Sequence, residues 1–217
     1  MIDKLPKNTL IQATRILVII GSEHPEMSYT QGHDRYVWVS LIVSIVFATQ
    51  GGLPPIFSEA ISYYLTYSFI SINPISADIE NFSKVESHFQ VLDALVETEA
   101  PQTSALLKSV GHSSMHYALK WELTLFADEH NIHELMYIWD HILLHIDDID
   151  DYVRCLCIGH IRQVPCTAMA DEMAQAMQRN RIWDVPKLIN NAEDILANMR
   201  GEISFYERIR MFCNCCL

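Results

Sequence analysis

A polar loop that contains Pro25 ends at Gly32, and the longest apolar run of the chain, residues 36–48, follows almost at once. Proline does not continue inside a helix, and glycine permits close approach of the backbone, so we expect a helix to begin directly after this glycine. The apolar run is shorter than the roughly 18 to 20 residues that a membrane span requires. It therefore predicts a long, buried core helix. Gln31 is expected to lie just before the start of that helix and outside the core.

Apolar residues recur every three or four positions along most of the chain, which is the spacing of one face of a helix. Glycine or proline breaks separate these segments, for example at residues 50–55 and at Asn73-Pro74. Asn131 is followed three positions later by Glu134, a spacing that predicts a capping box at the start of another helix. No segment of useful length alternates as a strand does, so the sequence predicts an all-α fold of about nine to eleven helices.

Half of the 217 residues (50%) are hydrophobic, which is enough to bury a sizeable core. The formal net charge is −12 with only 15 lysine and arginine residues, and this shortage of positive charge argues against binding to nucleic acid. No secretory signal or transmembrane segment is recognisable, which predicts a cytoplasmic protein. The six cysteines fit reduced thiols better than a disulfide framework.

Two motifs in the chain carry a resemblance to a known family. The first is Tyr-Thr-Gln-Gly at residues 29–32, and the second is an aromatic-rich segment at residues 117–127 followed by Leu-x-x-Ile-Trp-Asp at residues 135–140. In this order they resemble the TBC-domain family, the helical GTPase-activating proteins for Rab GTPases. The resemblance implies a short N-terminal segment (1–9), a TBC-like helical domain (10–198), and an amphipathic helix with a cysteine-rich tail (199–217).

TBC proteins insert two side chains into the GTPase, a glutamine that positions the attacking water and an arginine that stabilises the transition state. The resemblance gives the first role to Gln31. The arginine motif, Ile-x-x-Asp-x-x-Arg, is best matched by Met1, Lys4 and Lys7, and lysine carries the charge without the planar fork of guanidinium. Arg35, one helical turn after Gln31, is the candidate replacement, although a solvated arginine at a helix start is the plainer interpretation.

Five further residues belong to the two motifs. Tyr29 and Gly32 flank the glutamine, and the resemblance implies that they help to bind the partner. Trp121 and Trp139 are expected to be structural, because buried aromatic side chains dominate the packing of a core. Asp140 is expected to cap a helix or to pair locally and to take no part in chemistry.

The implied partner is a Rab-family small GTPase in its GTP form, in vesicle traffic, with no cofactor. The helices that precede the arginine motif in the family have no counterpart here, so two explanations stay open. Either the chain is a catalytically silent TBC module that serves as an adaptor, or a part supplied elsewhere completes an active domain. An unrelated helical scaffold is the third alternative, and the sequence names neither the target Rab nor the oligomeric state.

The histidines raise the question of a metal site. His130, His133, His141 and His145 are closely spaced, and the last two lie four residues apart, which is a ligand spacing on one helix face. However, Tyr137 stands where a metalloprotease helix needs its second histidine after His133. We therefore expect exposed histidines and no metal ion.

The C-terminal tail contains Cys213, Cys215 and Cys216 after an amphipathic segment. Lipidation of Cys215 and Cys216 would attach the chain peripherally to endomembranes, because two lipid chains anchor stably where one does not. A frayed tail of reduced thiols is the plainer alternative.

Overall fold

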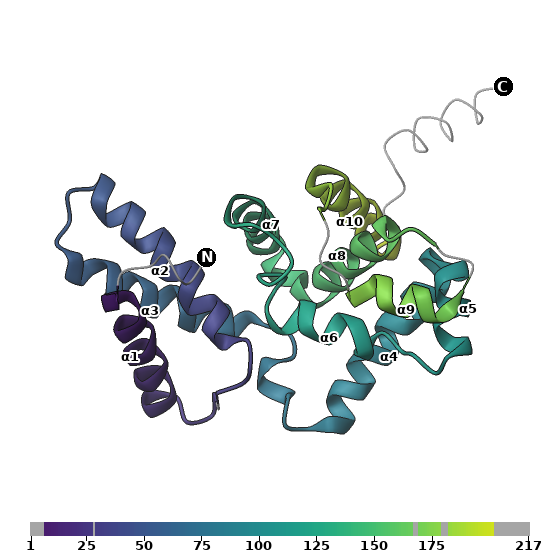
Figure 1. The fold of residues 1–217 in the computed structure, drawn as a ribbon, viewed down its shortest axis with the longest axis horizontal. Helices are drawn as coiled ribbons and strands as arrows, with labels where there is room; N and C mark the ends of the chain where they lie inside the picture. The colour runs from purple at the N-terminus through teal and green to yellow at the C-terminus, as the bar shows by residue number, and fades with distance from the viewer. Residues whose placement is uncertain (1–6, 28, 167–168, 179–181, 202–217) are drawn as a thin grey trace.

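The computed structural model describes residues 7–27, 29–166, 169–178 and 182–201. Within these ranges the chain forms ten α-helices and two 3₁₀ helices and no strand, which confirms the predicted all-α fold (Figure 1). The elements are α1 (Lys7–Glu23), α2 (His33–Gln50), α3 (Pro55–Ile72), η2 (Ser76–Asp78), α4 (Phe82–Glu99), α5 (Pro101–Ser109), α6 (Met115–Leu123), α7 (Ile132–Leu144), η3 (Ile146–Asp148), α8 (Ile149–Gln163), α9 (Ala170–Gln178) and α10 (Val185–Met199).

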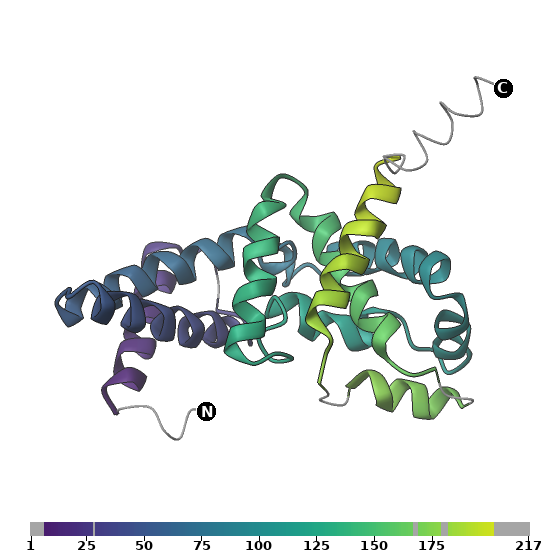
Figure 2. The same ribbon diagram turned by 90° about the horizontal axis from the view of Figure 1, so that it is seen from above.

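The helices α2 and α3 form a hairpin that, with α1 packed against it, extends away from the other helices, at the left of Figures 1 and 2. Small hydroxyl side chains are buried along both helices, Ser40 and Ser44 on α2 and Ser62 and Thr66 on α3, each at most 1% exposed. Such small side chains let two helix backbones approach closely. In the described parts of the chain, no helix combines the length and the apolar character needed to cross a membrane.

The most buried helix is α8, in which every residue from Tyr152 to Ile161 is buried. Helices α10, α4, α6 and α7 pack around it. The sequence predicts a buried core helix for the apolar run at residues 36–48. That prediction is wrong in part, because the run forms most of α2 but Val46 and Phe47 are exposed. The reason is that α2 packs mainly against α3 and α1, which leaves one side of its C-terminal half uncovered.

Buried hydrogen bonds join the hairpin to the remaining helices. The Tyr36 hydroxyl on α2 donates to the carbonyl oxygen of Leu123 at the end of α6 (2.7 Å). The amide of Asn73, which follows α3, donates to the Tyr36 hydroxyl (2.8 Å) and to the carbonyl oxygen of Glu122 (2.7 Å). The Tyr36 and Trp139 rings pack at 5.9 Å between centroids. These contacts fix the start of α2 against α6 and α7.

The predicted capping box at the start of α7 is confirmed. The Asn131 side chain accepts hydrogen bonds from the backbone N–H groups of His133 (3.0 Å) and Glu134 (3.1 Å). The Glu134 carboxylate accepts in return from the Asn131 backbone N–H (3.3 Å). The box satisfies N–H groups that have no partner within the helix, and so it sets where α7 begins.

Candidate functional site

The loop before α2 is held by the first residue of that helix, His33. Its Nδ1 accepts a hydrogen bond from the Thr30 N–H (3.3 Å), so the neighbouring Nε2 carries the proton and faces the Ser76 hydroxyl oxygen at 3.4 Å. Burial lowers the pKa of His33, which keeps the ring neutral and this arrangement intact near pH 7. The side chain thereby ties residues 29–32 to both α2 and η2.

Gly32 caps α2 in a backbone conformation that other residues rarely adopt, with φ at 113°. A Cβ atom at this position would lie 3.1 Å from the Cγ2 atom of Thr124, which follows α6. The motif glycine therefore serves two purposes. It turns the loop into the helix, and it lets the loop approach the end of α6.

We expect Gly32→Ala to lower the free energy of unfolding by about 1–3 kcal/mol, because it combines backbone strain with the clash against Thr124. Urea denaturation measures this loss. Gly111→Ala is the matched control, since Gly111 has a φ of +72° but nothing within 4 Å of its Cβ position. Adding Thr124→Ser should recover part of the Gly32→Ala loss, and an equal loss for both glycine variants would contradict the proposed contact.

A cavity of about 520 Å³ lies where this loop meets α6. Gln31 is exposed and lines it, two residues before α2 begins. The cavity is bordered on one side by the loop and the first turn of α2, and on the other by α6 and the turn that follows. Its lining residues are Tyr29, Gln31, Gly32, Asp34, Arg35, Leu119, Lys120, Leu123, Thr124 and Asp128.

The charges around this cavity are already paired with one another. Arg35 Nε lies 2.6 Å from a carboxylate oxygen of Asp128 and 4.0 Å from one of Asp34. Lys120 Nζ lies 3.7 Å from Asp128 and 3.1 Å from Glu129. Two cations therefore face three carboxylates, and an incoming phosphate would have to compete with Asp128 for Arg35.

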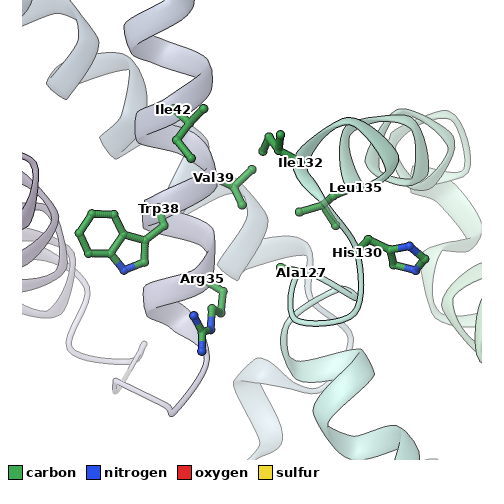
Figure 3. A pocket seen from close by; sticks show the side chains of 8 residues that line it. All are labelled: Arg35, Trp38, Val39, Ile42, Ala127, His130, Ile132 and Leu135. Atoms are coloured by element: carbon green, nitrogen blue, oxygen red, sulfur yellow. The ribbon is translucent and has the colours of Figure 1, made fainter. Parts of the chain in front are cut away.

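A second, smaller cavity of about 150 Å³ lies between α2 and the start of α7 (Figure 3). Val39 and Ile42 of α2 face Ile132 and Leu135 across it, and the His130 ring is turned away from it (Figure 3). Arg35 borders both cavities. The two cavities thus form one surface that is polar beside Gln31 and apolar farther along α2.

The sequence model of the Rab-GTPase-TBC domain matches residues 4–163, more than half of the chain, and this range includes every residue that lines the two cavities. The chain belongs to the Rab-GTPase-TBC domain family. The resemblance inferred from the two motifs is therefore confirmed.

Curated relatives of this TBC chain are the TBC domain-containing protein kinase-like proteins of Gallus gallus, Mus musculus and Homo sapiens. Each is 25% identical over 131 residues, which is 60% of this chain and 13% of the relative. The TBC chain therefore spans a small part of the length of the relatives that it matches. No solved structure matches it.

Four of the predicted site residues of this TBC domain line the same cavity: Tyr29, Gln31, Gly32 and Arg35. Lys7 is the first residue of α1, and its side chain lies outside the described part of the structure. Met1 and Lys4 lie outside the described residues, as do Cys215 and Cys216 of the tail. The roles of the glutamine, the lysine and the two cysteines stay predictions.

The two motif tryptophans of the TBC domain are buried. Trp139 also donates from its ring N–H to the carbonyl oxygen of Leu125 (2.8 Å). Asp140 is exposed, and its carboxylate makes no ion pair or hydrogen bond with any other described residue, so the predicted local pairing is not observed there.

Sequence reasoning missed the turn that forms the far wall of the cavity. Leu125 and Phe126 follow α6 with φ of 42° and 65°, a left-handed conformation that is costly for residues other than glycine. Both are fully buried, which compensates for the strain and fixes Thr124 and Asp128 on either side. Nothing in the residue types signals this turn, since neither glycine nor asparagine occurs in it.

The histidines considered as metal ligands have protein partners. His141 Nδ1 and His145 Nε2 approach one carboxylate oxygen of Glu193 on α10, at 3.4 and 2.9 Å. Both histidines are partly buried, so the prediction of exposed histidines is wrong for this pair, because α10 covers their side of α7. It is also wrong for His130, whose side chain is buried against His160. Across the described residues, no group of three or more histidine, cysteine or acidic side chains is arranged to hold a metal ion.

Proposed function

We propose that this chain regulates a Rab-family small GTPase in its GTP form, with Gln31 as the residue that acts on the attacking water. The observation that carries the proposal is the position of Gln31. The motif glutamine of a chain that belongs to the Rab-GTPase-TBC domain family is exposed at the edge of a large cavity, on a loop that His33 ties to α2 and Gly32 brings against the end of α6.

A small GTPase hydrolyses GTP slowly because nothing holds the attacking water and nothing neutralises the charge that develops on the transferred phosphoryl group. A side-chain amide can hold the attacking water, since it both donates and accepts hydrogen bonds. Gln31 would orient the water while the GTPase docks over the cavity beside α2 and α6. Helix starts and turns that are fixed before binding favour such positioning, because less ordering is required when the partner arrives.

The cavity offers little free positive charge to neutralise the charge that develops on the transferred phosphoryl group. Arg35 lies on the same cavity wall as Gln31, but its guanidinium is paired with Asp128. This pairing favours a second candidate function, that of a catalytically silent adaptor that binds the GTPase without accelerating hydrolysis. If Arg35 does serve as the cation, it must exchange Asp128 for the phosphate when the GTPase binds.

The first experiment measures single-turnover GTP hydrolysis by a panel of purified Rab GTPases, with and without this chain. For a responding Rab, Gln31→Ala should reduce the acceleration by about ten- to a hundredfold, the effect of removing one group that acts in the transition state. Gln90→Ala is the matched control, because Gln90 is an exposed glutamine on α4, away from the cavity.

Arg35→Ala and Lys7→Ala in the same assay identify the cation, since only the residue that supplies it should abolish acceleration. An arginine that acts in this way is worth about 10³ to 10⁵ in rate. Acceleration that survives Gln31→Ala would contradict the proposed role of the glutamine. A GTP-loaded Rab that binds without any acceleration would establish the adaptor.

The proposed setting is vesicle traffic in the cytoplasm, with peripheral attachment to endomembranes. It follows from the proposed partner, because Rab-family GTPases act on vesicles. Lipidation of Cys215 and Cys216 would contribute to attachment, and Cys215→Ser with Cys216→Ser should then lower the share of the chain found in the membrane fraction.

A further inference from the structure

The tip of the α2–α3 hairpin is free of charge over a long stretch. Residues 36–58 contain no acidic, basic or histidine side chain, in a chain of which 19% of the residues are charged. The stretch covers most of α2, the connecting turn and the first turn of α3. In both views the end of the hairpin lies far from α4–α10, and α1 is the described helix beside it (Figures 1 and 2).

The polarity of this hairpin is reversed relative to that of an ordinary surface hairpin. The hydroxyl side chains of Ser40, Ser44, Ser62 and Thr66 are buried along the two helices. None of these four oxygens has a hydrogen-bond partner among the described residues. Small hydroxyl residues between helices and apolar residues outside are the arrangement of helices packed in lipid.

Most of the exposed side chains of the tip are apolar, with Thr49 and Gln50 as exposed polar ones. Val46, Phe47, Leu53, Ile56 and Phe57 are between 38% and 68% exposed. They come from the last turn of α2, the connecting turn and the first turn of α3, so they gather at one end of the hairpin. A contiguous apolar surface of this kind marks a site of contact with a partner or a membrane.

The N–H groups of the connecting turn are satisfied within the chain, so the turn needs no outside hydrogen-bond acceptor. The N–H groups of Gly51, Gly52 and Leu53 donate to carbonyl oxygens near the end of α2, at 2.9, 3.3 and 2.8 Å. Pro54 and Pro55 have no N–H group. A protein partner could supply missing hydrogen bonds, whereas hydrocarbon cannot, so a turn with every N–H satisfied or absent favours lipid as the occupant.

The paired charges nearest the tip limit how deeply it can insert. Glu59 stands four residues into α3 and is paired with Arg15 of α1 at 2.5 Å. At about 1.5 Å per residue, this places the first charged pair roughly 6 Å from the turn. That distance matches the roughly 5–10 Å to which interfacial segments enter a bilayer.

We propose that residues 45–57, the tip of the hairpin, insert into the interfacial region of a lipid bilayer. Because the tip has no positive charge and the chain carries a net charge of −12, the surface that it fits has neutral headgroups, not anionic ones. Insertion would attach the chain to the membrane independently of the cysteine tail. The inference does not depend on the proposed function, because no GTPase takes part in it.

Co-sedimentation with small phosphatidylcholine vesicles tests this inference. The full chain carries Cys215→Ser and Cys216→Ser, so that the tail cysteines cannot contribute. We expect binding that is equal at about 0.15 M and about 0.5 M salt, because apolar burial is not screened. Phe47→Asp with Phe57→Asp should lower the vesicle-bound fraction about tenfold or more.

Leu143→Asp with Leu144→Asp is the matched control, since these two leucines are 46% and 76% exposed at the end of α7 and the variant adds the same charge. It should bind vesicles as the starting chain does. Circular dichroism and gel filtration establish that each variant is folded and report its oligomeric state. The inference is overturned if the starting chain does not sediment, if high salt releases it, or if both pairs of substitutions reduce binding equally. It is also overturned if gel filtration without lipid shows that the starting chain is a dimer and that the two phenylalanine substitutions dissociate it.

Discussion

Replacing Asn73 with alanine is expected to lower the free energy of unfolding by about 3–5 kcal/mol. The side chain is buried and makes four hydrogen bonds. Its amide N–H group donates to the Tyr36 hydroxyl and the Glu122 carbonyl, and its oxygen accepts from the N–H groups of Ile75 and Ser76. Alanine leaves these buried groups without partners, and each unsatisfied group costs about 1–3 kcal/mol. Urea denaturation followed by circular dichroism measures the loss.

The loss should be coupled to Tyr36, because the two side chains share one hydrogen bond at the joint between the hairpin and α6. In a double-mutant cycle of Asn73→Ala with Tyr36→Phe, we expect a coupling energy of about 0.5–3 kcal/mol. Asn81→Ala is the control, since Asn81 caps α4 at an exposed position and its loss should cost about 1 kcal/mol. A loss at Asn73 no larger than that at Asn81 would contradict the role assigned to this joint.

Acid is expected to destabilise the chain steeply below about pH 6.5, through a buried pair of histidines. His160 donates from Nδ1 to the Leu156 carbonyl oxygen (2.7 Å), and its Nε2 accepts from His130 Nε2 (2.8 Å). Burial lowers the pKa of His130 to about 4. Burial, and then the nearby His130, lower the pKa of His160 well below 6.5. Both rings are therefore neutral in the folded chain at pH values where they become charged in the unfolded chain.

The direction in which the free energy of unfolding changes with pH follows from this difference in proton binding. Above pH 6.5 neither state binds the protons, so the stability that the neutral pair permits is fully present. As the pH falls from 6.5 toward 4, the unfolded chain takes up to two more protons, and the free energy of unfolding decreases by about 1.4 kcal/mol per pH unit for each histidine. Urea denaturation at several pH values measures this slope.

His130→Gln should reduce the slope by about half, because the glutamine amide still donates to His160 but does not titrate. His133→Gln is the matched control, since His133 is exposed at the start of α7. We expect it to leave the slope unchanged. Equal slopes for the His130 variant and the unsubstituted chain would show that this pair does not cause the acid sensitivity.

Most of the fold could be predicted because helices leave local signals. The glycine and proline break at residues 50–55 separates α2 from α3, and the Asn131 and Glu134 spacing marks the start of α7. These signals depend on neighbours within one turn of helix, so they survive without knowledge of the tertiary structure. Predictions of burial were less reliable. The apolar run of α2 resembles a core helix in composition, and only the placement of its neighbours shows that its end is uncovered.

For the candidate site, the motif residues from Tyr29 to Gly32 could be predicted, and so could Arg35 beside them. The opposite wall could not, because Lys120 and Asp128 come from a distant part of the sequence and meet Arg35 only in the folded chain. The same holds for the neutral state of His33, which results from its burial.

The sequence by itself determined the helical class, the family motifs and the glutamine at the mouth of α2, since each is encoded by residue type and local spacing. The tertiary structure alone decided three further properties. It paired Arg35 with Asp128, it buried two histidines against each other, and it left the tip of the α2–α3 hairpin exposed. The physical reason is that pairing, desolvation and exposure depend on which distant residues come into contact, and long-range packing sets those contacts.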